Sequence, residues 1–200
     1  MAQDSKDLGP PGASRRTNVG RSSARQLCMR RSTLDDLPEI VLPDGYSLRA
    51  SQEGDGGHWA RIVRESFEDA SFDESRFKRE MQGHPAYLSE RIFFVCAADG
   101  TPCATASAYR SEAFGEDVGY LHMVGVCPAH TGRKIGFAVS LAALCRFRFE
   151  GLSTAVLQTD DFRTPAIKTY FRLGFSPFIN HDSHPSRWTA VRAKLDMRQE

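Results

Sequence analysis

A strand that runs through a glycine-containing basic turn into a helix constrains the fold of this chain more than any other stretch. Residues 124–136 read V-G-V-C-P-A-H-T-G-R-K-I-G. Pro128 lacks a backbone donor and ends the strand, and the residues after the turn have the apolar spacing of a helix. The glycines permit close approach to the backbone, while Arg133 and Lys134 bring positive charge to the N–H groups that open the helix. The stretch therefore predicts a site for a phosphate or pyrophosphate.

The composition is that of one soluble globular domain with some additional chain. The chain has 200 residues, of which 40% are hydrophobic and 26% charged. A net charge of +1 gives no reason to expect attraction to nucleic acid or to a membrane. Positive charge is concentrated at the start, which is also rich in Gly, Pro and Ser. We expect residues 1–33 to be a disordered basic tail and residues 34–200 to be the folded domain.

The cysteines and the absence of targeting segments favour a cytoplasmic protein. Five cysteines without a C-x-x-C spacing are typical of reduced thiols. No apolar run approaches the roughly 18 residues of a membrane span, and the start has no apolar core of a secretory signal. An organellar transit peptide is the alternative for the arginine- and serine-rich start, although Asp4 and Asp7 disfavour it.

Hydrophobic patterns predict the elements of the domain. Strands are expected at Gly45–Ala50, Arg91–Ala97, Cys103–Arg110, Val118–Val126, Thr154–Thr159, Phe175–Ile179 and Trp188–Lys194. Helices are expected at His58–Ala70, Asp73–Met81, Gly136–Glu150 and Ala166–Leu173, the last with Thr164 as its N-cap and Pro165 at its first position. Since a strand–helix–strand unit closes as a parallel crossover, Thr154–Thr159 is expected beside Val118–Val126. The fold class is α/β (α+β), with a mixed, mostly antiparallel sheet of about six to seven strands and about four flanking helices.

A second motif adds chemical meaning to the turn. Residues 166–175 read A-I-K-T-Y-F-R-L-G-F, and they follow V-x-P-x-x-x-G-x-x-x-G at residues 126–136. The two motifs at this separation resemble the GNAT superfamily of acyl-CoA-dependent N-acetyltransferases, over about residues 45–195. The resemblance implies a GNAT-like fold whose parallel strand pair is splayed at the coenzyme site.

By that resemblance, acetyl-CoA would be the co-substrate. The end of the strand would pair with the pantetheine arm like an added strand, because a splayed strand leaves N–H and C=O groups without partners. The amides of the turn would hold the pyrophosphate. The residues implied in coenzyme binding are Val124, Gly125, Val126, Thr131, Gly132, Arg133, Lys134, Ile135, Gly136, Arg163 and Ala166.

The turn departs from the family pattern at two positions. Thr131 stands where the family usually has Arg or Gln, and Lys134 stands where it has a central glycine. Because lysine adopts a positive φ less readily than glycine, either the turn is helical there or the side chain contributes charge to the phosphates. We favour the second alternative. Arg163 replaces a frequent Asn of the family and is expected to contact the coenzyme.

The resemblance implies that Tyr170 is the general acid, which protonates the CoA thiolate as the tetrahedral intermediate collapses. A phenol has a pKa near 10, close to that of an alkyl thiol. The alternative is a half-buried helix tyrosine that packs on the sheet. The base is harder to assign, since the family uses a Glu on the strand before the turn, or water. Alternation places Tyr120, His122 and Val124 on one face, and His122 is the preferred base, although a lone strand histidine is often structural.

Other chemistries fit less well. Cys127 beside the turn has no His and Asp arranged to activate it, and direct acyl transfer needs no acyl-enzyme. His181, Asp182 and His184 are metal-ligand types without a fourth ligand at a suitable spacing. Lys134 is not followed by Ser or Thr, as a nucleotide-binding P-loop requires.

The sequence thus predicts an N-acetyltransferase that moves acetyl from acetyl-CoA to a primary amine in a ternary complex. The alternative is a catalytically silent acyl-CoA-binding or protein-interaction module of the same fold. The acceptor is expected to be a small-molecule or peptide amine, bound between the His58–His84 region and the Ile179–Arg187 loop. No nucleic acid, membrane or metal partner is expected, and the protein is expected to be a monomer or homodimer.

Overall fold

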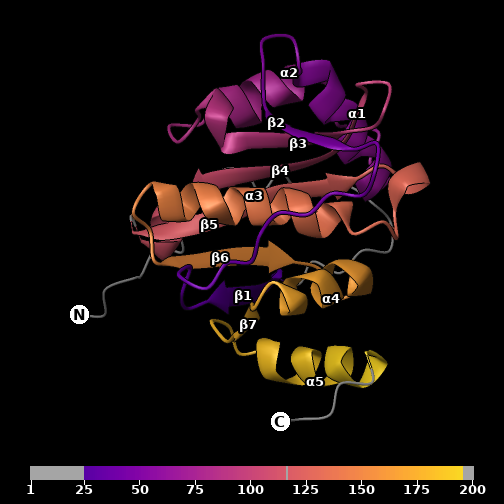
Figure 1. The fold of residues 1–200 in the computed structure, drawn as a ribbon. Coiled ribbons are helices and arrows are strands. Elements are labelled where there is room, and N and C mark those ends of the chain that lie inside the picture. The colour runs from indigo at the N-terminus through magenta and orange to yellow at the C-terminus, as the bar shows by residue number, and fades with distance from the viewer. Residues whose placement is uncertain (1–24, 116, 196–200) are drawn as a thin grey trace.

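The computed structural model describes residues 25–115 and 117–195, which contain one mixed sheet of seven strands (Figure 1). The strands are β1 Leu27–Arg31, β2 Ser47–Ala50, β3 Ile92–Cys96, β4 Pro102–Arg110, β5 Val118–Val126, β6 Thr154–Thr159 and β7 Ser176–Phe178. Their order across the sheet is β2-β3-β4-β5-β6-β1-β7. Only β5 and β6 pair in parallel within the described chain, and the other neighbours are antiparallel. The predicted fold class is therefore confirmed.

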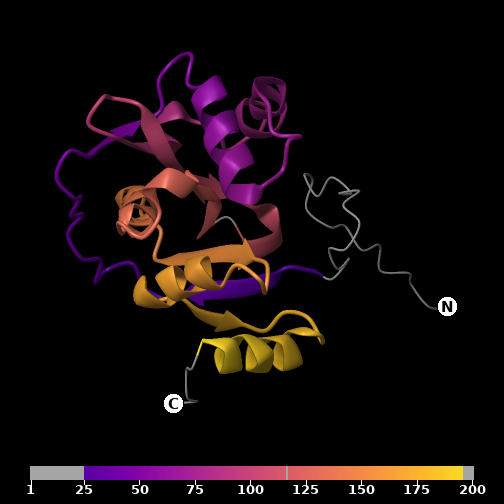
Figure 2. The same ribbon diagram turned by 90° about the vertical axis from the view of Figure 1, so that its right-hand side faces the viewer.

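Helices cover both faces of the sheet (Figure 2). The described residues contain α1 Gly56–Phe67, α2 Glu74–Arg76, α3 Ile135–Phe149, α4 Thr164–Arg172 and α5 His184–Lys194. Short turns of other helix types are η1 Phe77–Gln82, η2 Ser89–Arg91, η3 Glu112–Phe114 and η4 Pro128–His130. Buried residues of α3, α4 and α5 form one hydrophobic cluster with the sheet, and those of α1 and η1 form a second. The sheet thus lies between a layer with α1 and a layer with α3 and α4.

The N-terminal strand β1 corrects the predicted domain boundary. Leu27, Cys28 and Met29 are fully buried, and β1 lies inside the sheet between β6 and β7. Arg31 is also buried, and its guanidinium donates to the carbonyl oxygens of Thr33, at 2.8 Å, and of Leu173 at the end of α4. The prediction that the domain begins at residue 34 is therefore wrong. Disorder of residues 1–24 stays a prediction, because they lie outside the described residues.

The C-terminal segment is a helix, although a strand was predicted at Trp188–Lys194. Pro185 sits in the first turn of α5, where its fixed φ favours a helix. Trp188, Val191 and Leu195 follow at helical spacing and are all buried. The place beside β7, which the predicted strand would have taken, is held by β1. The described residues therefore contain five α-helices rather than four.

The other predicted elements are present with small shifts at their ends. The bounds of β5 and β6 match the predicted strands, and α3 begins and ends one residue earlier than predicted. Helix α4 begins at Thr164, so Arg163 rather than Thr164 is its N-cap residue. No helix of the described residues combines the length and apolar character needed to cross a bilayer.

A carboxylate just after α3 ties this helix to η2 and to β4. Glu150 accepts hydrogen bonds from Arg91 of η2 at 2.7 and 2.8 Å, from Arg110 of β4 at 2.9 Å and from Arg146 of α3 at 2.6 Å. Burial alone would raise the pKa of Glu150, but the three arginines outweigh it and lower that pKa to about 2. The carboxylate is therefore ionised at neutral pH. Glu150 therefore fixes the C-terminal end of α3, and the N-terminal end of the same helix forms part of the candidate site.

Candidate functional site

The candidate site begins where β5 and β6 separate. Their parallel ladder runs from the pair Val118 and Thr154 to the pair Leu121 and Leu157. Beyond that point β5 still pairs with β4 as far as Val126, but it has no ladder partner toward β6 in the described chain. The last residues of β5 therefore offer backbone N–H and C=O groups on one side, as the predicted splay requires.

A β-bulge at Met123 changes which side chains of β5 share a face. His122 pairs with Ser107 and Gly125 with Thr105, so that two residues of β5 lie opposite one residue of β4. Met123 adopts a left-handed φ of 48° at this point. Tyr120 and Met123 pack with the cluster under α1, whereas Val124 packs with the cluster under α3. The prediction that Val124 shares a face with Tyr120 and His122 is wrong, because the bulge shifts the alternation.

Glycines allow close packing at the end of β5. A Cβ atom at Gly125 would lie 2.5 Å from the Ser66 hydroxyl oxygen of α1. A Cβ atom at Gly136 would lie 3.2 Å from a methyl group of Val126. Both sides of this strand end are thus closely packed, and the direction left for a ligand is the side toward β6.

The turn before α3 is exposed and its last residue is strained. Residues 131–134 are exposed, and Ile135 is buried as the first residue of α3. Lys134 is the N-cap residue with a φ of 61°, so the predicted alternative of a helical conformation there is wrong. Lysine instead adopts the left-handed conformation that a glycine would take easily. A Cβ atom at Gly132 would meet nothing within 4 Å, which leaves this side of the turn open to a ligand.

Helix α4 brings Arg163 and Tyr170 to the same separation of strands. The guanidinium carbon of Arg163 lies 4.0 Å from the centre of the Phe67 ring, at the end of α1. Burial raises the pKa of Tyr170 to about 12, against a smaller lowering by the positive charge of Arg163. Tyr170 is therefore a protonated phenol at neutral pH. Ala166, one turn before it, packs against the hydrophobic cluster under α3.

Tyr120 lies in the paired part of β5, one residue before the last pair, and its side chain reaches across to β6. Its hydroxyl donates to the side-chain oxygen of Gln158 at 3.2 Å. Burial raises the pKa of Tyr120, and Cys28 and Tyr170 lie close enough to add to the rise. The structure thus brings together two of the predicted catalytic residues, Tyr120 and Tyr170.

His122 lies in a row of stacked rings under α1. Its ring centre is 5.1 Å from that of Tyr120 and 5.6 Å from that of Tyr109, which in turn stacks on His84 at 4.9 Å. Burial lowers the pKa of His122 to about 4, with a further contribution from His84. The imidazole is therefore neutral at pH 7 and has a free lone pair, but it is a weak base.

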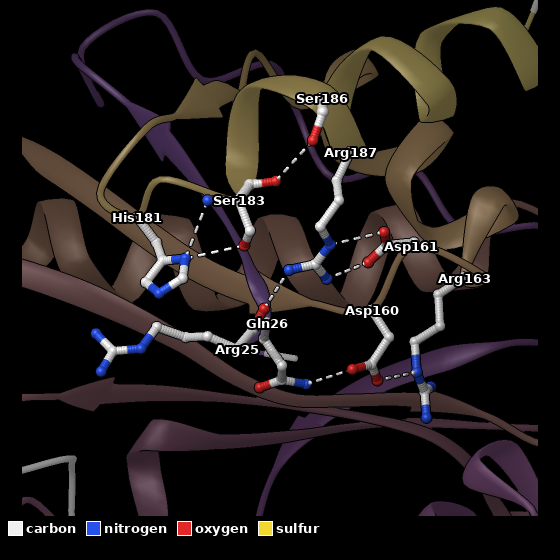
Figure 3. A network of polar contacts seen from close by, with 9 residues as sticks. All are labelled: Arg25, Gln26, Asp160, Asp161, Arg163, His181, Ser183, Ser186 and Arg187. Carbon is white, nitrogen blue, oxygen red and sulfur yellow. Dashed lines mark hydrogen bonds and ion pairs between the residues drawn. The ribbon is translucent and has the colours of Figure 1, made fainter. Parts of the chain in front are cut away.

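A network of polar contacts beyond β6 was not predicted from the sequence (Figure 3). Asp160 accepts hydrogen bonds from Gln26 at 3.2 Å and from Arg163 at 3.3 Å, and Asp161 accepts two from Arg187 of α5. The network fixes the loop between β6 and α4 to the start of β1 and to α5. The sequence signal was the acidic pair in D-D-F-R between a strand and a proline-started helix. Its effect is to hold Arg163 at the separation of β5 and β6.

Cys127, His181 and His184 are the residues of the disfavoured nucleophile and metal chemistries. Cys127 is buried, and burial raises the pKa of its thiol to about 12 although Arg61 lies 3.3 Å from the sulfur. His184 is fully buried, and its ring is tilted against that of His181, with ring centres 5.7 Å apart. Within residues 25–115 and 117–195, no group of three His, Cys, Asp or Glu side chains is placed to hold a metal ion.

A cavity of about 150 Å³ lies next to Tyr120, on the face of the sheet that α1 covers further along. It is lined by Arg30, Ala113, Phe114, Val118, Val156 and Phe178. The ring of Phe114 lies 5.7 Å from that of Tyr120, so the cavity lies beside the paired part of β5, just before the strands separate. Neither of the two regions predicted to hold the acceptor lines it. Sequence reasoning missed it because β1 had been assigned to the tail.

Comparison with known proteins agrees with this geometry. The model of the acetyltransferase (GNAT) family matches residues 58–175. A mycothiol acetyltransferase of Thermobispora bispora is 31% identical over 176 residues, which cover 84% of this chain and 59% of that protein. The corresponding protein of a Nocardioides species is 28% identical over 193 residues, which cover 88% of this chain and 65% of that protein. The chain thus spans about three fifths of the length of these curated relatives.

Solved structures show the same fold. A GCN5-related N-acetyltransferase from Sphaerobacter thermophilus superposes with a TM-score of 0.60 at 20% identity, over 78% of this chain and 50% of that one. The ribosomal-protein-S18-alanine N-acetyltransferase from Escherichia coli superposes with a TM-score of 0.54 at 19% identity, over 67% of this chain and 79% of that one.

Proposed function

Because this chain belongs to the GNAT family of acetyltransferases, we propose that it transfers the acetyl group of acetyl-CoA to a primary amine of its acceptor. Transfer is direct, in a complex of the protein with both substrates. The observation that carries the proposal is the free edge at the end of β5, which leads into the exposed turn before α3. A cytoplasmic location, and a monomer or homodimer, stay predictions.

The residues present fit acetyl-CoA. The backbone of Val124, Gly125 and Val126 has no strand partner toward β6, which suits the two amide groups of a pantetheine arm. The exposed turn provides N–H groups at the positive end of α3 for the pyrophosphate. The residues assigned to this role are Thr131, Gly132, Arg133, Lys134, Ile135 and Gly136, with Arg163 and Ala166 from the start of α4.

Tyr170 is assigned as the general acid. Bound acetyl-CoA supplies a thioester carbonyl for the amine to attack and a thiolate that needs a proton when the C–S bond breaks. Because the pKa of Tyr170 is raised to about 12, its proton is present at neutral pH. That pKa exceeds that of an alkyl thiol, so the raised value keeps the phenol protonated but makes proton transfer to the thiolate less favourable than matched pKa values would.

His122 is assigned as the base that receives the proton of the attacking amine. Its neutral imidazole is available above a pKa of about 4. Tyr120 lies between His122 and Gln158 and orients the ring through the stacking contact. A pKa of about 4 makes this imidazole a weak base, since a general base works best with a pKa near the working pH.

The acceptor is proposed to be an amine of a small molecule or a peptide. The names of the curated relatives support including mycothiol-related amines among the candidates.

The test is release of free CoA, followed with a thiol reagent, when the purified chain is mixed with acetyl-CoA and a panel of primary amines. The panel covers amino acids, short peptides, amino sugars and mycothiol-related amines. Release with at least one amine, and formation of its acetylated product by mass spectrometry, supports the proposal. Binding of acetyl-CoA without release on any amine would favour the alternative, a silent coenzyme-binding module.

A further inference from the structure

One row of residues across the sheet connects the candidate catalytic residues to the cavity. The registers pair Tyr109 with Tyr120, Tyr120 with Val156, and Val156 with Arg30. Paired residues of neighbouring strands project from the same face. Since adjacent strands lie about 4.8 Å apart, the Cα atom of Arg30 lies two strand spacings, about 10 Å, from that of Tyr120.

Arg30 is the charged residue in an otherwise apolar lining. Its guanidinium carbon lies 5.8 Å from the centre of the Phe178 ring, and both residues line the cavity. The side chain is exposed, and within the described residues it has no carboxylate partner. Arg31 and Arg187, by contrast, are paired with Asp36 and Asp161. A guanidinium left unpaired beside apolar walls is suited to an anionic group that comes from a ligand.

From this arrangement we propose that the acceptor carries an anionic group, a carboxylate or a phosphate, which Arg30 binds while the amine lies at the separation of β5 and β6. The inference rests on the proposed acetyltransferase function and names the class of its acceptor. The apolar part of the acceptor contacts Phe114, Val156 and Phe178. The Cα atoms of Arg30 and Tyr120 lie about 10 Å apart, so an acceptor of about three extended peptide residues has the length to reach from one to the other.

The test compares matched acceptors that differ only in the anionic group. Tripeptides of apolar residues are supplied as free carboxylates and as C-terminal amides, and aminoalkyl phosphates of similar length are compared with the corresponding amino alcohols. The wild-type protein is expected to show a kcat/KM about tenfold higher for the anionic member of at least one pair. The pair that shows the preference distinguishes a carboxylate from a phosphate.

Arg30→Gln assigns the effect to this side chain. The variant is expected to bring the ratio close to one and to leave the dissociation constant of acetyl-CoA unchanged, while Arg30→Lys retains part of the preference. Arg148→Gln removes an exposed arginine at the far end of α3 and serves as the control, with an unchanged ratio. Equal rates for anionic and neutral acceptors in the wild type, or a ratio that persists in Arg30→Gln, would overturn the inference.

A binding measurement separates this inference from the proposed function. If no amine releases CoA, the proposed function fails. The N-acetylated tripeptides are then titrated into the protein by calorimetry, as carboxylates and as amides, with the corresponding phosphate and alcohol pair. Tighter binding of an anionic member that is lost in Arg30→Gln supports the anionic subsite, and equal binding of both members refutes it.

Discussion

Replacing Lys134 by glycine is expected to separate two effects of this residue on the turn before α3. Lys134 has a φ of 61°, a conformation in which the Cβ atom of an L-residue lies too close to the backbone. Its exposed ammonium group also stands beside the N–H groups proposed to hold the pyrophosphate. Lys134→Gly removes both the Cβ atom and the charge, whereas Lys134→Ala removes only the charge.

The two variants differ in their expected stabilities. The left-handed conformation costs a residue with a Cβ atom about 1–2 kcal/mol, which glycine avoids. Glycine also gives the unfolded chain more freedom, which offsets about 0.5–1 kcal/mol of that gain. Lys134→Gly is therefore expected to raise the free energy of unfolding by about 0.5–1 kcal/mol, or the Tm by about 1–4 °C. Lys134→Ala keeps the Cβ atom and is expected to leave stability nearly unchanged.

The two variants are expected to lose the same amount of coenzyme affinity. An exposed charge pair contributes about 1 kcal/mol, which corresponds to about a fivefold higher dissociation constant for CoA. The loss should shrink at high salt because exposed charges are screened. Unfolding is followed by circular dichroism without coenzyme, and CoA binding by calorimetry.

A variant at the other end of α3 serves as the control for both measurements. Arg148→Ala removes one exposed positive charge from the other end of α3, and it should change neither quantity by much. If Lys134→Gly is no more stable than Lys134→Ala, the argument from backbone strain is wrong. If both variants bind CoA as the wild type does, the side chain contributes no charge to the phosphates.

Three further predictions concern the acid, the base and the end of α3. Tyr170→Phe is expected to lower kcat by about 100-fold or more, since general acids contribute about 10²–10⁴-fold to the rate. The dissociation constant of acetyl-CoA should not change. An unchanged kcat would show that Tyr170 is not the general acid. If His122 is the base, the pH profile of kcat/KM should fall on its acidic side near the His122 pKa of about 4. His122→Gln should abolish this fall. A fall near pH 6–7 that persists in the variant would exclude His122 as the base. Glu150→Gln should cost about 2–3 kcal/mol of stability at pH 7. The pKa of Glu150 is about 2 in the folded protein and 4.5 in the unfolded chain. The wild type should therefore have its full excess in free energy of unfolding over the variant above pH 4.5, and should lose it as the pH falls toward 2, as measured by urea unfolding. An excess that does not depend on pH would contradict the role of the charge.

Local patterns were sufficient to predict the centre of the fold. The strands β5 and β6 have their predicted bounds, because their residues are almost continuously apolar between clear glycine and proline breaks. The parallel pairing of β5 and β6 was also predictable, since a strand–helix–strand unit normally closes as a right-handed parallel crossover. The turn between β5 and α3 was located for the same reasons.

What the sequence pattern missed depends on contacts between distant residues. Strand β1 has only three consecutive apolar residues between arginines, and it is stabilised by pairing with residues more than 120 positions away. Residues 188–194 have an apolar pattern that suits either a strand or a helix, and burial of Trp188 and Val191 against the sheet decides for the helix. The bulge at Met123 carries no glycine or asparagine that would reveal a positive φ.

The site was predicted in part for the same reason. The turn and Tyr170 belong to motifs that lie close together along the chain. The cavity and Arg30 do not, because they require β1 to lie between β6 and β7.

The position of β1 also sets the order in which the sheet can be completed. Strand β1 leaves the ribosome before the other strands of this sheet, and it pairs with β6 and β7, which are the last of them to be made. Until β1 pairs with its neighbours, β6 has an unpaired edge and β7 has no neighbour within the described sheet. Unpaired strand edges favour association between chains. A shortened chain that starts at residue 34 would hold this unfinished state permanently. Expression of the folded domain is therefore expected to require β1, although the sequence around this strand has the composition of a disordered tail.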